Sequence, residues 1–195
     1  MSNNESKSAK LAKSIYEFAE MIVAAMLITI VIFMFLGRLT VVDGPSMMNT
    51  LHDKEVLVVS KTGYTPGIGD IVVFQQPDSH VKGAVVKRVI ATAGQTVDID
   101  FDNWIVYVDG EPLYTDSDGL PAIEPYVNYV EGARMNEYDI NFPITVPEGE
   151  LFLMGDNRNK SNDSRSSDIN TVDERYIFGR VLFRISPFSK FGTVK

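Results

Sequence analysis

The longest apolar stretch of the chain lies near its N-terminus. Residues 21–36 are apolar apart from Thr29, and further apolar side chains recur just before them. A helix needs about 20 residues to cross the hydrocarbon core of a bilayer. The flanking charged residues, such as Glu17 and Arg38, can reach toward the lipid headgroups. The pattern therefore predicts a transmembrane helix over residues 15–37.

A cleaved signal peptide is the alternative interpretation of this segment. The apolar run is longer than the hydrophobic region of most signal peptides, and residues 37–42 contain no small-x-small cleavage pattern. We therefore expect an uncleaved signal-anchor. The three lysines within residues 1–14 place that tail in the cytoplasm by the positive-inside rule. Residues 38–195 would then follow a single crossing of the cell membrane and form an extracytoplasmic domain rich in β-structure.

After residue 39 the pattern changes to short β-branched runs between turn signals, which is typical of strands. Asp109-Gly110 is a hairpin turn signal after one of these runs. Residues 116–147 show no clean alternation, and we expect an irregular insertion there, with room for a hairpin of its own. The predicted fold class is mostly β, an antiparallel β-sheet domain behind one N-terminal transmembrane helix. The expected strands are residues 55–60, 70–75, 84–91, 96–100, 104–108, 151–154 and 177–185.

Charge and composition exclude several classes of function. The formal net charge is −8, and the acidic excess lies after Arg38. Nucleic-acid binding is not expected, because phosphate contacts need clustered lysine and arginine. The chain contains no cysteine, which removes disulfides, thiolate nucleophiles and cysteine-bound zinc. The only histidines are His52 and His80, and neither stands in a context that suggests a catalytic triad.

The first segment that suggests chemistry contains Ser46. Gly44-Pro45 comes directly before it and favours a tight backbone that could expose the hydroxyl and aim the Ser46 N–H outward. Ser46 follows Leu36 by ten residues, so it lies within about 35 Å of the bilayer even if the link is extended. A plain Gly-Pro turn with a surface serine is the alternative, and this segment alone does not exclude it.

The second segment is the predicted strand that contains Lys87. Alternation places Lys87 on one face with Val85, Val89 and Ala91. Burial among valines would disfavour the ammonium form and lower the pKa of this lysine from about 10.4. Such a shift would make the amine usable as a general base near pH 7. An exposed lysine that protects a sheet edge is the alternative.

The third segment is the polar run of residues 155–168, which follows an apolar strand. Its acids, amides, hydroxyls and arginines can build a hydrogen-bonded, ion-paired scaffold, or they can form a solvated loop. Asp156, Asp163 and Asp168 lack the spacing of a known calcium loop, so no metal site is expected.

Taken together and in order, these segments resemble the type I signal peptidases, and most closely their single-anchor bacterial branch. The resemblance is carried by the anchor, Gly-x-Ser-Met at 44–47, Gly-Asp-Ile-Val-Val-Phe at 69–74, Lys-Arg-Val at 87–89 and Gly-Asp-Asn-Arg…Ser-x-Asp-Ser-Arg at 155–165. Each motif alone is weak, whereas the ordered set is specific. The family implies a mostly antiparallel β fold and a serine endopeptidase that removes signal peptides from exported preproteins at the outer membrane face.

The resemblance also implies roles for individual residues. Ser46 matches the nucleophile, Lys87 the general base, and Ser161 the serine that hydrogen-bonds and orients the lysine. Met47 is similar to the methionine that lines the substrate pocket and buries the lysine. The polar scaffold behind the dyad is matched by Asp156, Arg88, Asp163 and Arg165.

Two positions depart from the family pattern. Some relatives carry a serine whose hydroxyl enters the oxyanion hole, and here that position is Gly44. The hole must then rest on the Ser46 N–H with a neighbouring N–H or a water. Asn49 stands where the family usually has proline, which affects the local turn and not the nucleophile.

The implied mechanism proceeds through an acyl-enzyme and requires no metal or cofactor. The partners expected are preprotein signal peptides, with small residues at the first and third positions before the cut, and the lipid bilayer.

Two rival classes remain. The self-cleaving repressors use a similar serine/lysine dyad, but would carry a DNA-binding helical domain in place of the anchor. An inactive membrane-tethered adaptor would be expected to lack Ser46, Lys87 or Ser161, and all three are present.

Overall fold

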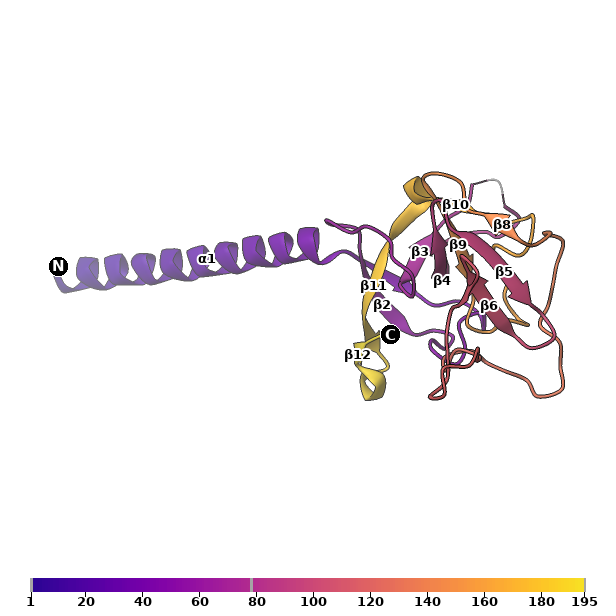
Figure 1. Cartoon of the computed structure of the whole chain (residues 1–195). Coiled ribbons are helices and arrows are strands. Elements are labelled where there is room, and N and C mark those ends of the chain that lie inside the picture. Colours follow the sequence, from indigo (N-terminus) through magenta and orange to yellow (C-terminus); the bar gives the residue numbers. More distant parts are fainter. Residues whose placement is uncertain (1, 78, 195) are drawn as a thin grey trace. The chain divides into compact units, whose positions relative to one another are not determined.

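The computed structural model describes residues 2–77 and 79–194, and the side chains of the N-terminal helix within residues 12–31. The chain forms two compact units, Met1–Gly37 and Arg38–Lys195. The first unit is the helix α1, Ser2–Leu36 (Figure 1). Within the described residues, this is the one helix long and apolar enough to cross a membrane, over Ala12–Val31. The helix begins earlier than the predicted residue 15, because residues 2–14 contain no proline or glycine to interrupt it.

The second unit, which we call the sheet unit, is built on one large antiparallel sheet (Figure 1). The last long strand of the chain lies in its interior, between two early strands. The order across the sheet is β1 (Arg38–Val41), β2 (Val56–Ser60), β11 (Ile177–Ser186), β3 (Ile71–Phe74), β4 (Val85–Thr92), β9 (Glu150–Met154) and β10 (Val172–Asp173), and β12 (Gly192–Thr193) pairs with β11.

A smaller antiparallel sheet packs beside the large one. Its order is β7 (Glu111–Pro112), β6 (Ile105–Val108), β5 (Thr96–Asp100) and β8 (Ile144–Thr145). Asp109 and Gly110 join β6 to β7 with φ of 56° and 85°, which confirms the predicted hairpin turn. Two short 3₁₀ helices, Glu174–Tyr176 and Phe188–Lys190, flank β11.

The predicted fold class is confirmed: the sheet unit is mostly antiparallel β. All seven predicted strands form, with ends that differ by at most one residue. The four-residue strand β1 was not predicted. The two-residue strands β7, β8, β10 and β12 were also not predicted, because two residues carry no readable alternation. Residues 116–147 are largely without regular structure, apart from β8 and an isolated bridge between Thr115 and Pro121.

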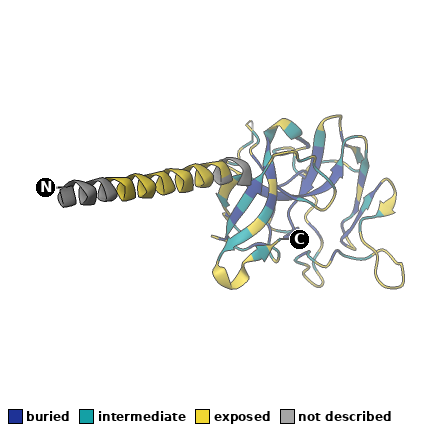
Figure 2. Ribbon diagram, turned by 90° about the vertical axis from the view of Figure 1, so that its left-hand side faces the viewer, coloured by how far each residue is buried: buried dark blue, intermediate teal, exposed yellow. Residues whose placement is uncertain are grey.

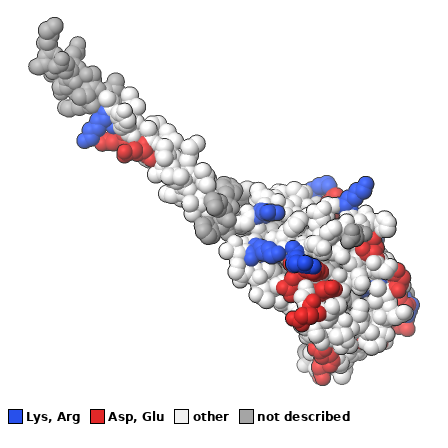
Figure 3. Space-filling model, turned by 90° about the horizontal axis from the view of Figure 1, so that it is seen from above, with Lys and Arg blue, Asp and Glu red and all other residues white. Residues whose placement is uncertain are grey.

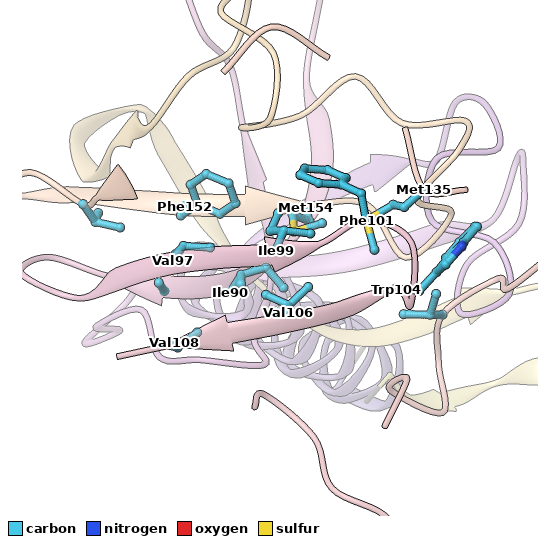
Figure 4. Close-up of a cluster of buried hydrophobic side chains, with 13 residues drawn as sticks. Ile90, Val97, Ile99, Phe101, Trp104, Val106, Val108, Met135, Phe152 and Met154 are labelled. Atoms are coloured by element: carbon cyan, nitrogen blue, oxygen red, sulfur yellow. The ribbon is translucent and has the colours of Figure 1, made fainter. Parts of the chain in front are cut away.

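The core of the sheet unit consists of three clusters of buried apolar side chains. The strands of this unit carry many of the buried residues (Figure 2). The largest fills the space between the small sheet and strands β4 and β9, around Trp104, Phe152 and Met154 (Figure 4). On the face drawn in Figure 3, acidic side chains gather beside a few basic ones, and much of the remaining surface is uncharged.

Strand β4 contributes to all three clusters. Val86 belongs to the cluster that includes Leu57 and Val59 of β2. Val89 belongs to the cluster around β3 and β9, and Ile90 and Ala91 belong to the one in Figure 4. The pairing of β4 with β9 shifts register between Val89 and Ala91. The prediction that Ala91 shares the Lys87 face was therefore wrong, because this irregularity interrupts the alternation.

Candidate active site

Ser46 and Lys87 meet at the N-terminal end of strand β4. Ser46 begins a turn shortly after β1, and its Oγ accepts a hydrogen bond of 2.9 Å from Lys87 Nζ. The same Nζ donates to the carbonyl of Val86 at 3.1 Å. Lys87 is only 2% exposed, whereas Ser46 is half-buried. A buried amine thus contacts a hydroxyl that solvent or a ligand can still reach.

Burial gives Lys87 an unusual proton affinity. Loss of hydration lowers its pKa to about 8; the nearby carboxylates of Asp163 and Asp156 oppose this effect, and the charge of Arg165 adds to it. With this pKa, about one lysine in ten is neutral at pH 7, against about one in three thousand at the ordinary value. The amine can therefore act as a base at neutral pH.

A pocket of about 230 Å³ opens beside the two residues. The segment that follows β1, strand β4 and the residues before β4 supply apolar side chains to its walls, and Asn162 lines it from the polar loop. Its lining includes Val42, Ser46, Met47, Val85, Val86 and Lys87. Met47 is 1% exposed and packs into the adjacent core cluster, so one of its faces supports the turn that carries Ser46. The pocket can hold short apolar side chains next to the hydroxyl.

The polar loop, residues 155–168, lies behind the dyad and is buried rather than solvated over most of its first half. Asp156 accepts from Arg88 Nε at 2.9 Å and Arg88 Nη2 at 2.8 Å. It also accepts a hydrogen bond from Thr50 Oγ1, on the Ser46 turn. Asp163 accepts from Arg165 Nε at 2.8 Å and Arg165 Nη2 at 2.9 Å. The loop therefore forms the ion-paired scaffold that was one of its two predicted alternatives.

The charges in this scaffold balance. Burial alone would raise the pKa of Asp163, but the charge and hydrogen bonds of Arg165 outweigh burial and hold that pKa below its ordinary value. Each of three buried arginines has its own buried carboxylate, and among the residues that the structure describes no carboxylate forms an ion pair with Lys87. The three pairs are Arg88–Asp156, Arg165–Asp163 and Arg158–Glu124.

Ser161 is buried beside the dyad. A Cβ built at Gly155 would collide with Ser161 Oγ and come within 2.5 Å of the Ser46 carbonyl oxygen, so those two atoms flank Gly155. Ser161 Oγ makes no hydrogen bond of normal geometry within the described residues, although the nearby hydroxyl helps to lower the pKa of Asp163. The hydrogen bond from Ser161 to the lysine stays a prediction, since Lys87 Nζ here contacts Ser46 and Val86.

The backbone at Gly44 is left-handed, with φ of 90°. Its N–H donates to Asp53 Oδ1 at 2.9 Å, so it is not directed at the Ser46 hydroxyl. No protein atom lies within 4 Å of a Cβ built there, but a side chain would be strained by this φ. The position is thus suited to glycine and contributes no hydroxyl to the pocket.

Three residues of the site were not assigned a role from the sequence. Glu124, from the irregular insertion, is 2% exposed and accepts from Arg158 Nη2 at 2.9 Å. Arg158 Nε also donates to the Gly155 carbonyl at 3.2 Å. Asn157 donates from its backbone N to the Ser46 carbonyl and from Nδ2 to the Pro45 carbonyl, each at 3.0 Å. Arg158 and Asn157 stand in the quoted motif, whereas nothing in the pattern around Glu124 indicates burial.

Comparison with known proteins gives a consistent picture. Residues 15–186 match the family described as signal peptidase, peptidase S26. The chain is 35% identical over 188 residues to a protein named Probable signal peptidase I-1 of Synechocystis sp., which covers 91% of this chain and 86% of that protein. It is 33% identical to signal peptidase I of Bacillus licheniformis (95% and 96% covered) and 31% identical to signal peptidase IB of Staphylococcus aureus (93% and 94% covered).

Proposed function

Since the chain belongs to the signal peptidase family, peptidase S26, we propose that it uses Ser46 and Lys87 as the catalytic dyad of a type I signal peptidase. Such an enzyme is a membrane-bound serine endopeptidase that removes signal peptides from exported preproteins. The observation that carries the assignment is the hydrogen bond of 2.9 Å between the buried Lys87 Nζ and Ser46 Oγ at the edge of a pocket.

The acylation step follows from this contact. Neutral Lys87 removes the proton of Ser46 Oγ while that oxygen attacks the scissile carbonyl of the preprotein. The Ser46 N–H stabilises the resulting oxyanion. When the carbon–nitrogen bond breaks, the Lys87 ammonium gives its proton to the leaving amine, and the signal peptide remains bound to Ser46 as an ester.

Deacylation uses the same groups. Lys87, neutral again, takes a proton from a water molecule, whose oxygen attacks the ester carbonyl. The second tetrahedral intermediate collapses, the carbon–oxygen bond to Ser46 breaks, and the proton returns from Lys87 to Ser46 Oγ. The Lys87 amine takes up and releases each proton that moves in the cycle, and the proposed steps use no metal or cofactor.

The supporting residues keep the dyad aligned. Asp156, held by Arg88, accepts a hydrogen bond from Thr50 and so fixes the turn behind Ser46. Asp163, held by Arg165, accepts a hydrogen bond of 3.0 Å from the Gly155 N–H and fixes the loop that carries Ser161. Ser161 is proposed to steady Lys87 when substrate displaces the ground-state contact.

The substrate is proposed to bind as an extended peptide beside Asp43, with its small side chains in the pocket formed by Val42, Met47 and Val86. Residues 15–37 are proposed to anchor the enzyme in the lipid bilayer by a single crossing, with residues 1–14 in the cytoplasm and residues 38–195 outside. Nucleic acid is not among the proposed partners.

Two pairs of variants test the dyad in the full-length enzyme. Ser46→Ala and Lys87→Ala should each abolish cleavage of a preprotein in vesicles. Ser117→Ala and Lys160→Ala change an exposed serine and an exposed lysine and should cleave normally. An acylating penem should label the wild-type protein and not Ser46→Ala. Cleavage retained by either dyad variant would show that the nucleophile or the base is another group.

A further inference from the structure

Asn157 donates hydrogen bonds to the backbone carbonyls of the nucleophile and of the residue before it. It comes 112 residues after Pro45 in the chain, yet its Nδ2 donates to the Pro45 carbonyl at 3.0 Å. Its backbone N–H donates to the Ser46 carbonyl, also at 3.0 Å. Asn157 itself is 3% exposed and stands within the ion-paired loop, so its position is set by buried neighbours. The carbonyl groups of Pro45 and Ser46 are therefore both held by Asn157, from the side of the polar loop.

The bond to Pro45 also determines where the Ser46 N–H points. The Pro45 carbonyl and the Ser46 N–H belong to the same peptide unit, which is planar and trans, and in such a unit these groups point in opposite directions. When Asn157 holds the carbonyl toward the polar loop, the N–H must point away from that loop. Within the described residues, no acceptor bonds the Ser46 N–H.

A free, preoriented N–H is the feature an oxyanion hole requires. Donors stabilise a developing oxyanion only if they already point at its future position, because reorientation during the reaction would cost free energy. Here Gly44 brings no hydroxyl, and its own N–H is committed to Asp53. The Ser46 N–H must therefore carry more of the stabilisation, and its direction matters more.

We infer that Asn157 is a positioning residue of the oxyanion hole: its side-chain amide holds the Pro45–Ser46 peptide so that the Ser46 N–H faces the scissile carbonyl. The inference rests on the proposed function, since it presupposes that Ser46 is the nucleophile. Asn157 touches neither substrate nor the reacting hydroxyl and acts through the peptide bond alone.

Two substitutions isolate the side-chain contact. Asn157→Ala removes the donor to Pro45 and keeps the backbone N–H that bonds the Ser46 carbonyl. Asn157→Asp keeps the size but places an oxygen opposite the Pro45 carbonyl, where only a donor fits. Asn159→Ala is the matched control, because Asn159 lies in the same loop and its side chain hydrogen-bonds the backbones of Asn136 and Arg134, away from Ser46.

The measurements use full-length enzyme in detergent and a peptide that spans a signal-peptide cleavage site. For both Asn157 variants, kcat should fall by about 10- to 100-fold, somewhat less than for outright loss of an oxyanion-hole donor. KM should stay within about twofold, since ground-state binding does not use the hole. A peptide aldehyde, whose adduct with Ser46 resembles the oxyanion, should lose affinity by the same factor as kcat. The pH midpoint of kcat/KM should not move, because Lys87 is untouched.

Several results would overturn the inference. These are a kcat within twofold of the Asn159→Ala control, a rise in KM that accounts for the whole loss, aldehyde affinity that stays constant while kcat falls, or a displaced pH midpoint. Thermal unfolding of each variant shows whether a loss of activity comes from loss of the fold. If Asn157→Ala does not fold, Asn157→Asp tests the inference in its place. Failure of the dyad itself would appear separately, as cleavage by Ser46→Ala.

Discussion

Replacing Lys87 with methionine should abolish cleavage and at the same time stabilise the folded sheet unit at neutral pH. Methionine has a similar length and fills the same buried position without a charge. The expectation follows from the burial of the amine, which is 2% exposed and forms no ion pair with a carboxylate of the described residues. The lysine proposed as the general base should therefore be a residue whose replacement raises the free energy of unfolding.

The magnitude can be worked from the pKa of Lys87. It falls from an ordinary 10.5 to about 8, mainly through burial, and each pH unit of such a difference corresponds to about 1.36 kcal/mol. The ammonium therefore costs the fold about 3 kcal/mol below pH 8. The hydrogen bonds that methionine cannot make to Ser46 and Val86 are worth about 1 kcal/mol. The net expectation is a gain of about 2 kcal/mol in the free energy of unfolding at neutral pH.

The sign of the pH dependence follows from proton binding. Because the folded pKa is depressed, the unfolded chain binds more protons than the folded one between about pH 8 and pH 10.5, and wild-type stability rises with pH through that window. The advantage of Lys87→Met should therefore shrink by about 2 kcal/mol between about pH 6.5 and about pH 9.5.

Urea unfolding followed by tryptophan fluorescence measures this difference. Trp104 is the chain's single tryptophan and is 1% exposed, so its emission reports the core of the sheet unit. Lys160→Met, which changes an exposed lysine in the polar loop, should show no pH-dependent difference from wild type. A Lys87→Met protein that is less stable than wild type at neutral pH, or whose difference does not vary with pH, would refute the reasoning.

Three further predictions concern the base, the loop and the buried ion pairs. The value of kcat/KM should rise about tenfold per pH unit and level off above about pH 8, where Lys87 is neutral; a profile that is flat between pH 6 and 9 would contradict this. Gly155→Ala should lose more than about 100-fold in activity, since its Cβ would overlap Ser161 and crowd the Ser46 carbonyl, whereas Gly67→Ala, whose Cβ meets one atom at 3.6 Å, should cleave normally. Arg158→Met leaves the buried carboxylate of Glu124 without its ion-pair partner and should lower the free energy of unfolding by about 3 to 5 kcal/mol. Arg175→Met, at an exposed ion pair, should lower it by less than about 1 kcal/mol. Equal losses would show that burial is not the cause.

Much of the fold could be predicted from local patterns, and the contact between Ser46 and Lys87 could be expected from the order of the motifs. Alternation of β-branched residues is enough to place strands, and a lysine between valines already suggests burial, as at Lys87. The ordered motifs then link Ser46, Lys87 and the polar loop through a resemblance, which no single motif would support. What these signals share is that each is complete within a few neighbouring residues.

The rest depends on contacts that the local pattern does not record. The register shift in β4 that moved Ala91 arises from pairing with β9, and an alternation pattern has no signal for it. Glu124 is buried because Arg158 reaches it from another loop, and its own neighbourhood is irregular. Asn157 bonds carbonyl groups, which every residue carries, so no residue type marks its partners.

The position of β11 has a consequence for how the enzyme is made. The ribosome completes Ser46 and Lys87 in the first half of the chain, but β11, Ile177–Ser186, lies between β2 and β3 in the sheet. Until that strand arrives, β2 and β3 have no partner between them, and the polar loop that grips the Ser46 turn has itself only just been synthesised. The proposed pair of Ser46 and Lys87 is therefore not assembled in a chain that still lacks β11, and proteolytic activity should begin only after that strand has joined the sheet.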